Sequence, residues 1–118
     1  MRSVLSLLVV LSALTVAFAI PGNARAAGAV VSTKITGIGV LSTQFAVVTF
    51  AANIAFKPLC HTGGNAMVID VTTSKGKALL SLAQSALLAD LFVTATGTGT
   101  CTNTGSSQEN LNNLSVTR

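Results

Sequence analysis

The side chains best suited to chemistry are His61 and Asp70, which have serine hydroxyls near them in the sequence. A Ser-His-Asp arrangement would use the hydroxyl as nucleophile, the imidazole as its base and the carboxylate to orient the imidazole. The chain has no G-x-S-x-G segment, and Asp and Glu together number only three. The sequence therefore predicts no enzyme. We expect His61 to be a solvated loop residue and Asp70 to accept hydrogen bonds near a helix N-terminus.

Cys60 and Cys101 are the only cysteines of the chain. If they pair, they close a loop of about 40 residues, which contributes roughly 4 kcal/mol by restricting the unfolded chain. A zinc site needs three or four ligands, whereas Cys60 with the adjacent His61 supplies two. A catalytic thiol would have to stay reduced outside the cytoplasm. We therefore expect a disulfide between Cys60 and Cys101, and neither a metal nor a cofactor.

The first 26 residues have the pattern of a secretory signal peptide. Arg2 provides a positive start, residues 4–20 are almost wholly apolar, and small residues stand at both ends of Ala24-Arg25-Ala26. A transmembrane anchor is the alternative, but Ser and Thr interrupt the apolar run and a cleavage-like site follows it directly. We expect residues 1–26 to be removed and residues 27–118 to form one secreted or periplasmic domain without a membrane span.

The composition argues against a nucleic-acid partner. The chain has 118 residues, of which 50% are hydrophobic and 8% charged, and its formal net charge is +4. Loss of Arg2 and Arg25 with the signal peptide leaves five basic and three acidic residues, a net charge of +2. Phosphate binding needs clustered Lys and Arg with stacking aromatics, but only Lys75 and Lys77 lie close together.

Hydrophobic periodicity predicts five strands and one helix in the exported part. The expected strands cover residues 30–41, 45–56, 66–71, 91–96 and 111–117, and the helix covers 75–90 between the third and fourth strands. Gly37 and Gly39 suggest a bulge in the first strand. The apolar side of the helix, with Leu79, Leu82 and Leu87, should pack on the sheet. The four phenylalanines of the exported part should lie in the core, namely Phe45, Phe50, Phe56 and Phe92.

The fold class expected from this order is mainly β with one helix. A small α+β domain and a five-stranded barrel with one helix both satisfy it. Residues 97–110 are rich in Gly, Thr, Ser and Asn and should form a loop. The candidates for a ligand-facing polar loop are Thr62, Asn65, Asn103 and Thr104, each of which is equally a turn residue.

The element order, with its single helix between the third and fourth strands, is that of the OB-fold barrel. The stretch from Met67 to Cys101 resembles the strand-helix-strand-Cys core of secreted bacterial proteins like the subtilase cytotoxin B subunit. These are relatives of the receptor-binding subunits of AB-type toxins. The resemblance lies in Asp70 closing a strand, Gly76-Lys77-Ala78 opening the helix, and the segment from Gly97 to Cys101 after the returning strand.

The resemblance implies a non-catalytic OB-fold binding or assembly domain. Its partners would be further copies of the chain, in a homo-oligomer such as a pentameric ring, together with a toxin A-type subunit or host-surface glycans. No ligand residue carries over from the toxin subunits. Sugars commonly stack on Trp or Tyr, and the chain has neither. The alternative is an exported structural or interaction protein without glycan binding.

Signal-peptide removal is directly measurable. We expect the exported protein to begin at Ala27, because the peptidase accepts small residues at positions −3 and −1. Intact-mass spectrometry and N-terminal sequencing of the secreted protein test this. A protein that retains Arg2 and stays in the membrane fraction would instead be anchored.

Overall fold

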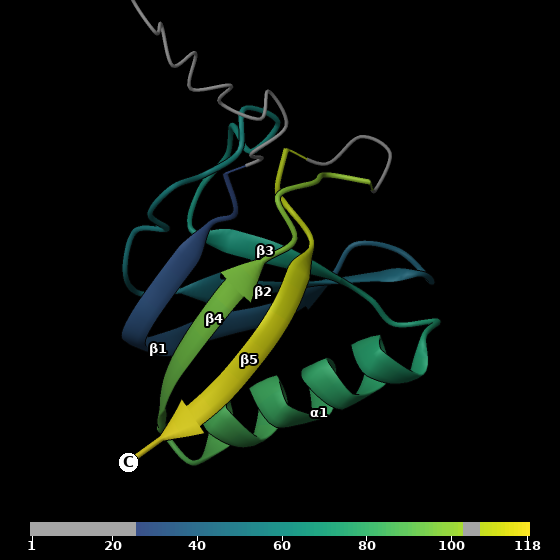
Figure 1. Cartoon of the computed structure of the whole chain (residues 1–118). Coiled ribbons are helices and arrows are strands. Elements are labelled where there is room, and N and C mark those ends of the chain that lie inside the picture. Colours follow the sequence, from purple (N-terminus) through teal and green to yellow (C-terminus); the bar gives the residue numbers. More distant parts are fainter. Residues whose placement is uncertain (1–25, 103–106) are drawn as a thin grey trace, which may run out of the picture.

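A computed structural model describes residues 26–102 and 107–118 (Figure 1). A five-stranded sheet and one helix make up these residues. In chain order the elements are β1 (Ala29–Val40), β2 (Phe45–Phe50), β3 (Ala66–Asp70), α1 (Ser74–Leu88), β4 (Phe92–Gly97) and β5 (Leu111–Thr117). The predicted architecture of five strands, with the helix between the third and fourth, is confirmed. The signal-peptide prediction concerns residues that lie, except for Ala26, outside the described part of the chain.

The long strand β1 is the centre of the sheet. The strand order is β3-β2-β1-β4-β5, and all of the paired neighbours are antiparallel. The register of β1 shifts between Ile35 and Gly37 on the β2 side and between Val30 and Thr33 on the β4 side. These irregularities bend β1, so its C-terminal part pairs with β2 and its N-terminal part with β4. The predicted bulge in this strand is confirmed.

The sheet does not close into a barrel, and in this respect the OB-like barrel prediction is wrong. Its end strands are β3 and β5, which are linked by a single parallel bridge between Val68 and Asn110. There the Val68 N–H donates to the Glu109 carbonyl oxygen at 2.9 Å. The helix packs against both β3 and β5 (Figure 1), so it covers the opening that a continuous ladder would have closed.

The core lies between the curved sheet and α1. It consists of aliphatic side chains from all five strands, the Phe50 ring, and the small side chains of the helix. Apolar residues with almost no exposed surface include Val30, Ala46, Val48, Phe50, Met67, Val68, Ile69, Ala83, Ala86, Val93 and Ala95. β3 is apolar on both faces, because the sheet and α1 enclose it from two sides.

Strand β2 is shorter than predicted, and this changes where the phenylalanines lie. β2 ends at Phe50 rather than at Phe56, and the φ of Phe56, 57°, lies outside the extended region. The Phe56 side chain is 78% exposed and that of Phe92 is 42% exposed. Of the four phenylalanines expected in the core only Phe50 is fully buried, so the prediction for Phe56 and Phe92 is wrong.

Helix α1 begins where the sequence predicted. The Thr73 hydroxyl accepts a hydrogen bond from the Gly76 N–H at 2.9 Å, which makes Thr73 the N-cap. The fully buried positions of the helix are small: Gly76, Ala83 and Ala86. Small residues allow the helix axis to approach the sheet closely, and the leucines then lie along its flanks. Leu82, expected to face the sheet, is 36% exposed, so that placement is corrected.

Asp70 ends β3 and prepares the turn into α1. Its carboxylate accepts hydrogen bonds from the side-chain hydroxyl and the backbone N–H of Thr72, and the Gln44 amide contributes a third. These bonds stabilise the ionised form, with the Thr72 hydroxyl as the largest contribution, and they lower the pKa of Asp70 below its ordinary value. The predicted role of Asp70 as a hydrogen-bond acceptor near the helix N-terminus is confirmed.

The close contact at the start of α1 is testable. A Cβ added at Gly76 would overlap the Asp70 carbonyl oxygen, which belongs to the backbone and cannot swing away. We therefore expect Gly76→Ala to destabilise the fold by about 1 to 3 kcal/mol, the usual cost of overpacking. Gly37→Ala is the matched control, because a Cβ there meets nothing within 4 Å. Urea unfolding followed by circular dichroism compares the two, and equal midpoints would contradict the proposed contact.

Candidate functional site

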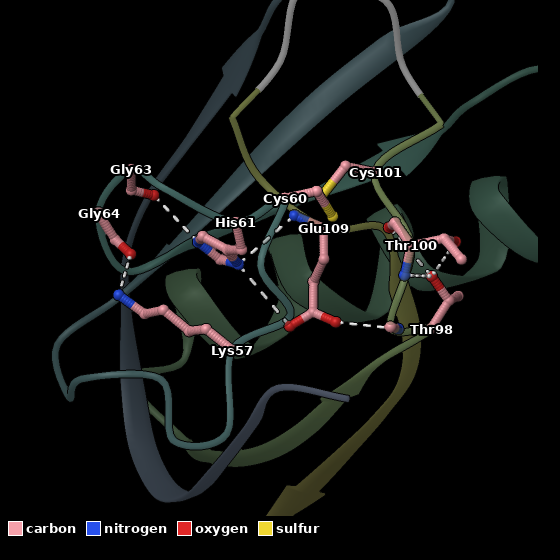
Figure 2. Close-up of polar contacts among 10 residues, drawn as sticks. Lys57, Cys60, His61, Gly63, Gly64, Thr98, Thr100, Cys101 and Glu109 are labelled. Atoms are coloured by element: carbon pink, nitrogen blue, oxygen red, sulfur yellow. Dashed lines mark hydrogen bonds and ion pairs between the residues drawn. A yellow bond between two sulfur atoms is a disulfide. The ribbon is translucent and has the colours of Figure 1, made fainter. Parts of the chain in front are cut away.

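Three segments distant in sequence meet at one end of the sheet. These are the loop after β2 (residues 51–65), the loop after β4 (98–102) and the segment before β5 (107–110). The disulfide between Cys60 and Cys101 joins the first two, with Cα atoms 6.0 Å apart (Figure 2). The predicted disulfide is confirmed. It is consistent with the oxidising extracellular or periplasmic location expected for an exported protein.

A buried carboxylate lies beneath this disulfide. The Glu109 side chain is fully buried, although it belongs to the segment that looks most polar in sequence. Its Oε2 accepts a hydrogen bond from the Gly99 N–H at 3.0 Å, and its Oε1 lies 3.7 Å from His61 Nδ1 (Figure 2). Oε1 accepts no hydrogen bond from the described residues. A buried carboxyl group is costly unless it is bonded, so the hydrogen bond from the Gly99 N–H to Oε2 offsets part of the cost of burying Glu109.

Two glycines make room for the Glu109 side chain. A Cβ at Gly28 would overlap Oε1, and a Cβ at Gly97 would overlap the carboxyl group. Gly28 precedes β1 and Gly97 ends β4, so the carboxyl group lies between the beginning and the end of neighbouring strands. The Gly97 N–H also donates to the Gly28 carbonyl oxygen at 2.8 Å. Glu109 therefore packs directly against the backbone of the sheet.

His61 is the partner of Glu109 and not the solvated loop residue that the sequence predicted. Its exposed fraction is 5%. The Gly63 carbonyl can only accept, so Nε2 carries a proton and donates to it at 3.0 Å. Nδ1 then accepts the backbone N–H of Glu109 at 3.4 Å. The ring thus closes the tight turn through Gly63 on one side and holds the Glu109 backbone on the other.

The predicted ligand-facing residues are partly placed by the structure. Thr62 is exposed, and its N–H donates to the Ser107 carbonyl oxygen at 2.8 Å. Asn65 is half-buried, and its carbonyl oxygen accepts the Phe50 N–H at 2.8 Å. Both belong to the loop that the disulfide and His61 hold. Asn103 and Thr104 lie outside the described residues.

The site has the properties of a rigid scaffold. The His61 side chain contacts Gly63 and Glu109, whereas the Asp70 side chain contacts Gln44 and Thr72, so the two side chains do not form a pair. Residues 26–102 and 107–118 contain no group of three side chains that could hold a metal ion. In the same ranges, no helix has the length and apolar character needed to cross a bilayer. The Cys60–Cys101 disulfide, His61 and Glu109 instead fix the conformation of the loop of residues 51–65.

Sequence reasoning did not find Glu109. It lies in the run Ser106-Ser107-Gln108-Glu109-Asn110, whose polarity predicts a solvated loop. The contacts that bury it come from His61, Gly97 and Gly28, and they are remote from it in the chain. No residue next to Glu109 in the sequence indicates that it is buried, because the groups that enclose it come from other segments of the chain.

Comparison with known proteins gives no match, whether with family models, with curated proteins or with solved structures. The resemblance to toxin B subunits therefore rests on the residues quoted above.

Glu109 and Gly97 allow a coupled test of the buried site. Glu109→Ala leaves a cavity and an unpaired Gly99 N–H, and we expect it to cost about 2 to 5 kcal/mol of unfolding free energy. Gly97→Ala alone should also destabilise, because its Cβ overlaps the carboxyl group. In the Glu109→Ala background the new methyl group enters vacated space, so Gly97→Ala should cost less there. Urea unfolding of all four proteins measures the coupling, and strictly additive costs would show that the two residues are not in contact.

Proposed function

We propose that this chain is an exported, non-catalytic binding or assembly domain of the type found in the B subunits of AB-type toxins. It acts as a homo-oligomer, such as a pentameric ring, and it recognises host-surface glycans. A toxin A-type subunit is the partner that such an oligomer would carry. The observation that supports this proposal best is the rigid loop of residues 51–65, which the Cys60–Cys101 disulfide and the buried Glu109 hold from two sides.

Binding sites are often formed by loops that a rigid scaffold positions, because such a loop loses little conformational entropy when a ligand binds. The loop carries Thr62, which is exposed, and Asn65, which is half-buried. A hydroxyl and an amide of this kind bond readily to the hydroxyl groups of a sugar. They are the groups through which we propose that the glycan is held.

A second function has its own support. The alternative is an exported structural or interaction protein without glycan binding. Large apolar side chains are exposed at both ends of β2, notably Phe56 and Leu59 in the loop and Val40 at the hairpin. Apolar surface of this kind favours association with protein over contact with a polar ligand.

A glycan array probed with the secreted, disulfide-bonded protein distinguishes the two functions. We expect binding to at least one glycan class, weakened at least about tenfold by Thr62→Ala, which removes an exposed hydroxyl without touching the core. Thr117→Ala is the matched control, since it removes an exposed hydroxyl near the far end of β5. A folded oligomer that binds no glycan would favour the structural alternative. A glycan that binds the Thr62→Ala protein equally well would place the site elsewhere.

A further inference from the structure

An open apolar groove lies between α1 and the β1–β2 hairpin. Its volume is about 590 Å³, and every side chain lining it is apolar except that of Gln84. Ile38 and Val40 form one wall, and Leu80, Leu87 and Leu88 of α1 form the other. Val40 is 82% exposed and Leu88 is 88% exposed. A groove of this size is large enough to receive bulky side chains, and no charged residue would have to lose its water.

The groove follows from how the helix packs. Because α1 turns Gly76, Ala83 and Ala86 toward the sheet, its leucines lie on the flanks. Burial of one such side chain would contribute about 1.5 to 3 kcal/mol, which the single chain does not gain from Leu88. The isolated domain therefore has a concave apolar surface that it does not cover itself.

The loop at the other end of β2, residues 51–65, exposes two large apolar side chains instead of a groove. Phe56 is 78% exposed and Leu59 is fully exposed at 101%. Between them Pro58 is buried, and the Lys57 Nζ donates to the Gly64 carbonyl oxygen at 3.0 Å, which ties down the charge next to Phe56 (Figure 2). The φ of Phe56, 57°, is rare for an aromatic residue and persists only where the surroundings hold it. The loop therefore presents two protruding apolar side chains on a backbone that its own contacts hold.

The two surfaces cannot meet within one chain. The loop follows the C-terminal end of β2 and the hairpin precedes its N-terminal end (Figure 1). A strand of six residues separates its ends by about 17 to 20 Å. A contact between loop and groove must therefore join two copies. It uses different patches on the two copies, and where it is not reciprocated about a two-fold axis it is a head-to-tail arrangement.

We propose that Phe56 and Leu59 of one copy insert into the groove between α1 and the β1–β2 hairpin of the next copy. This inference rests on the assembly half of the proposed function and names the contact that makes it. No charged residue lines the groove, and the one charge between Phe56 and Leu59, that of Lys57, is directed to the Gly64 carbonyl oxygen. The expected mature net charge of +2 opposes the approach of two copies only weakly. A bulky aromatic residue in an apolar pocket is the usual energetic centre of an interface. The assembly closes into a ring where the rotation between copies permits it.

Sedimentation of the secreted, disulfide-bonded protein over a range of concentrations tests the contact. The loop variant is Phe56→Asn with Leu59→Ser, in which Asn tolerates the positive φ. The groove variant is Val40→Glu with Leu88→Glu. All four side chains are mostly exposed, so both variants should keep the native circular dichroism spectrum. We expect an oligomer for the unaltered protein, and for each variant a dissociation constant raised at least about thirtyfold.

A mixture of the two variants gives the sharper result. The loop variant keeps its groove and the groove variant keeps its loop, so one contact can form between them and no further one. We expect a dimer of one copy of each. The control is Leu82→Glu, which charges a partly exposed leucine of α1 that does not line the groove, and it should leave the oligomer intact.

Each outcome separates this contact from the broader function. An oligomer that survives in both variants, or a mixture that stays monomeric although each variant folds, would overturn the head-to-tail contact alone. An unaltered protein that is monomeric at every concentration would overturn both the contact and the assembly half of the proposed function. Glycan binding is scored separately on the array, so its failure leaves the contact standing.

Discussion

Burial of the Glu109 side chain is the constraint on which the end of the sheet with the loop of residues 51–65 depends. A carboxyl group out of water is unfavourable unless polar groups bond to it, and here the Gly99 N–H donates to Oε2 while the His61 ring accepts the backbone N–H of Glu109 itself. The same side chain fills space that Gly28 and Gly97 leave free beside the sheet. One residue thus connects the start of β1, the end of β4 and the loop after β2. The Cys60–Cys101 disulfide adds a covalent link above it.

This internal bracing decides what the loop can present to a partner. A loop held by Glu109, His61 and a disulfide loses little freedom when another molecule contacts it. At the far end of β2 the small residues of α1 pack closely and leave leucines along the edge of a groove. The domain therefore leaves two apolar surfaces uncovered, the protruding side chains of Phe56 and Leu59 and the groove beside α1. In our proposal the loop of one copy fills the groove of another.

The predictions that succeeded depend on near neighbours in the chain. Alternating β-branched residues marked the strands, Thr72-Thr73-Ser74 marked the helix start, and Gly37 lies where the register of β1 shifts. The predictions that failed concern long-range packing. His61 and Phe56 were each assigned from residue type, as solvated and as core, and the structure reverses both. Barrel closure failed because α1 covers the gap between β3 and β5.

The sequence by itself determined the element order, the helix start and the pairing of two lone cysteines, because these follow from local periodicity and from the absence of any other thiol. Only the tertiary structure decided that Glu109 is buried, since its partner His61 is 48 residues away and burial of a polar side chain depends on groups that folding brings together. It also decided which apolar residues stay outside. Phe56 and Leu82 were expected in the core and against the sheet, and their exposure follows from the end of β2 and from the close packing of α1.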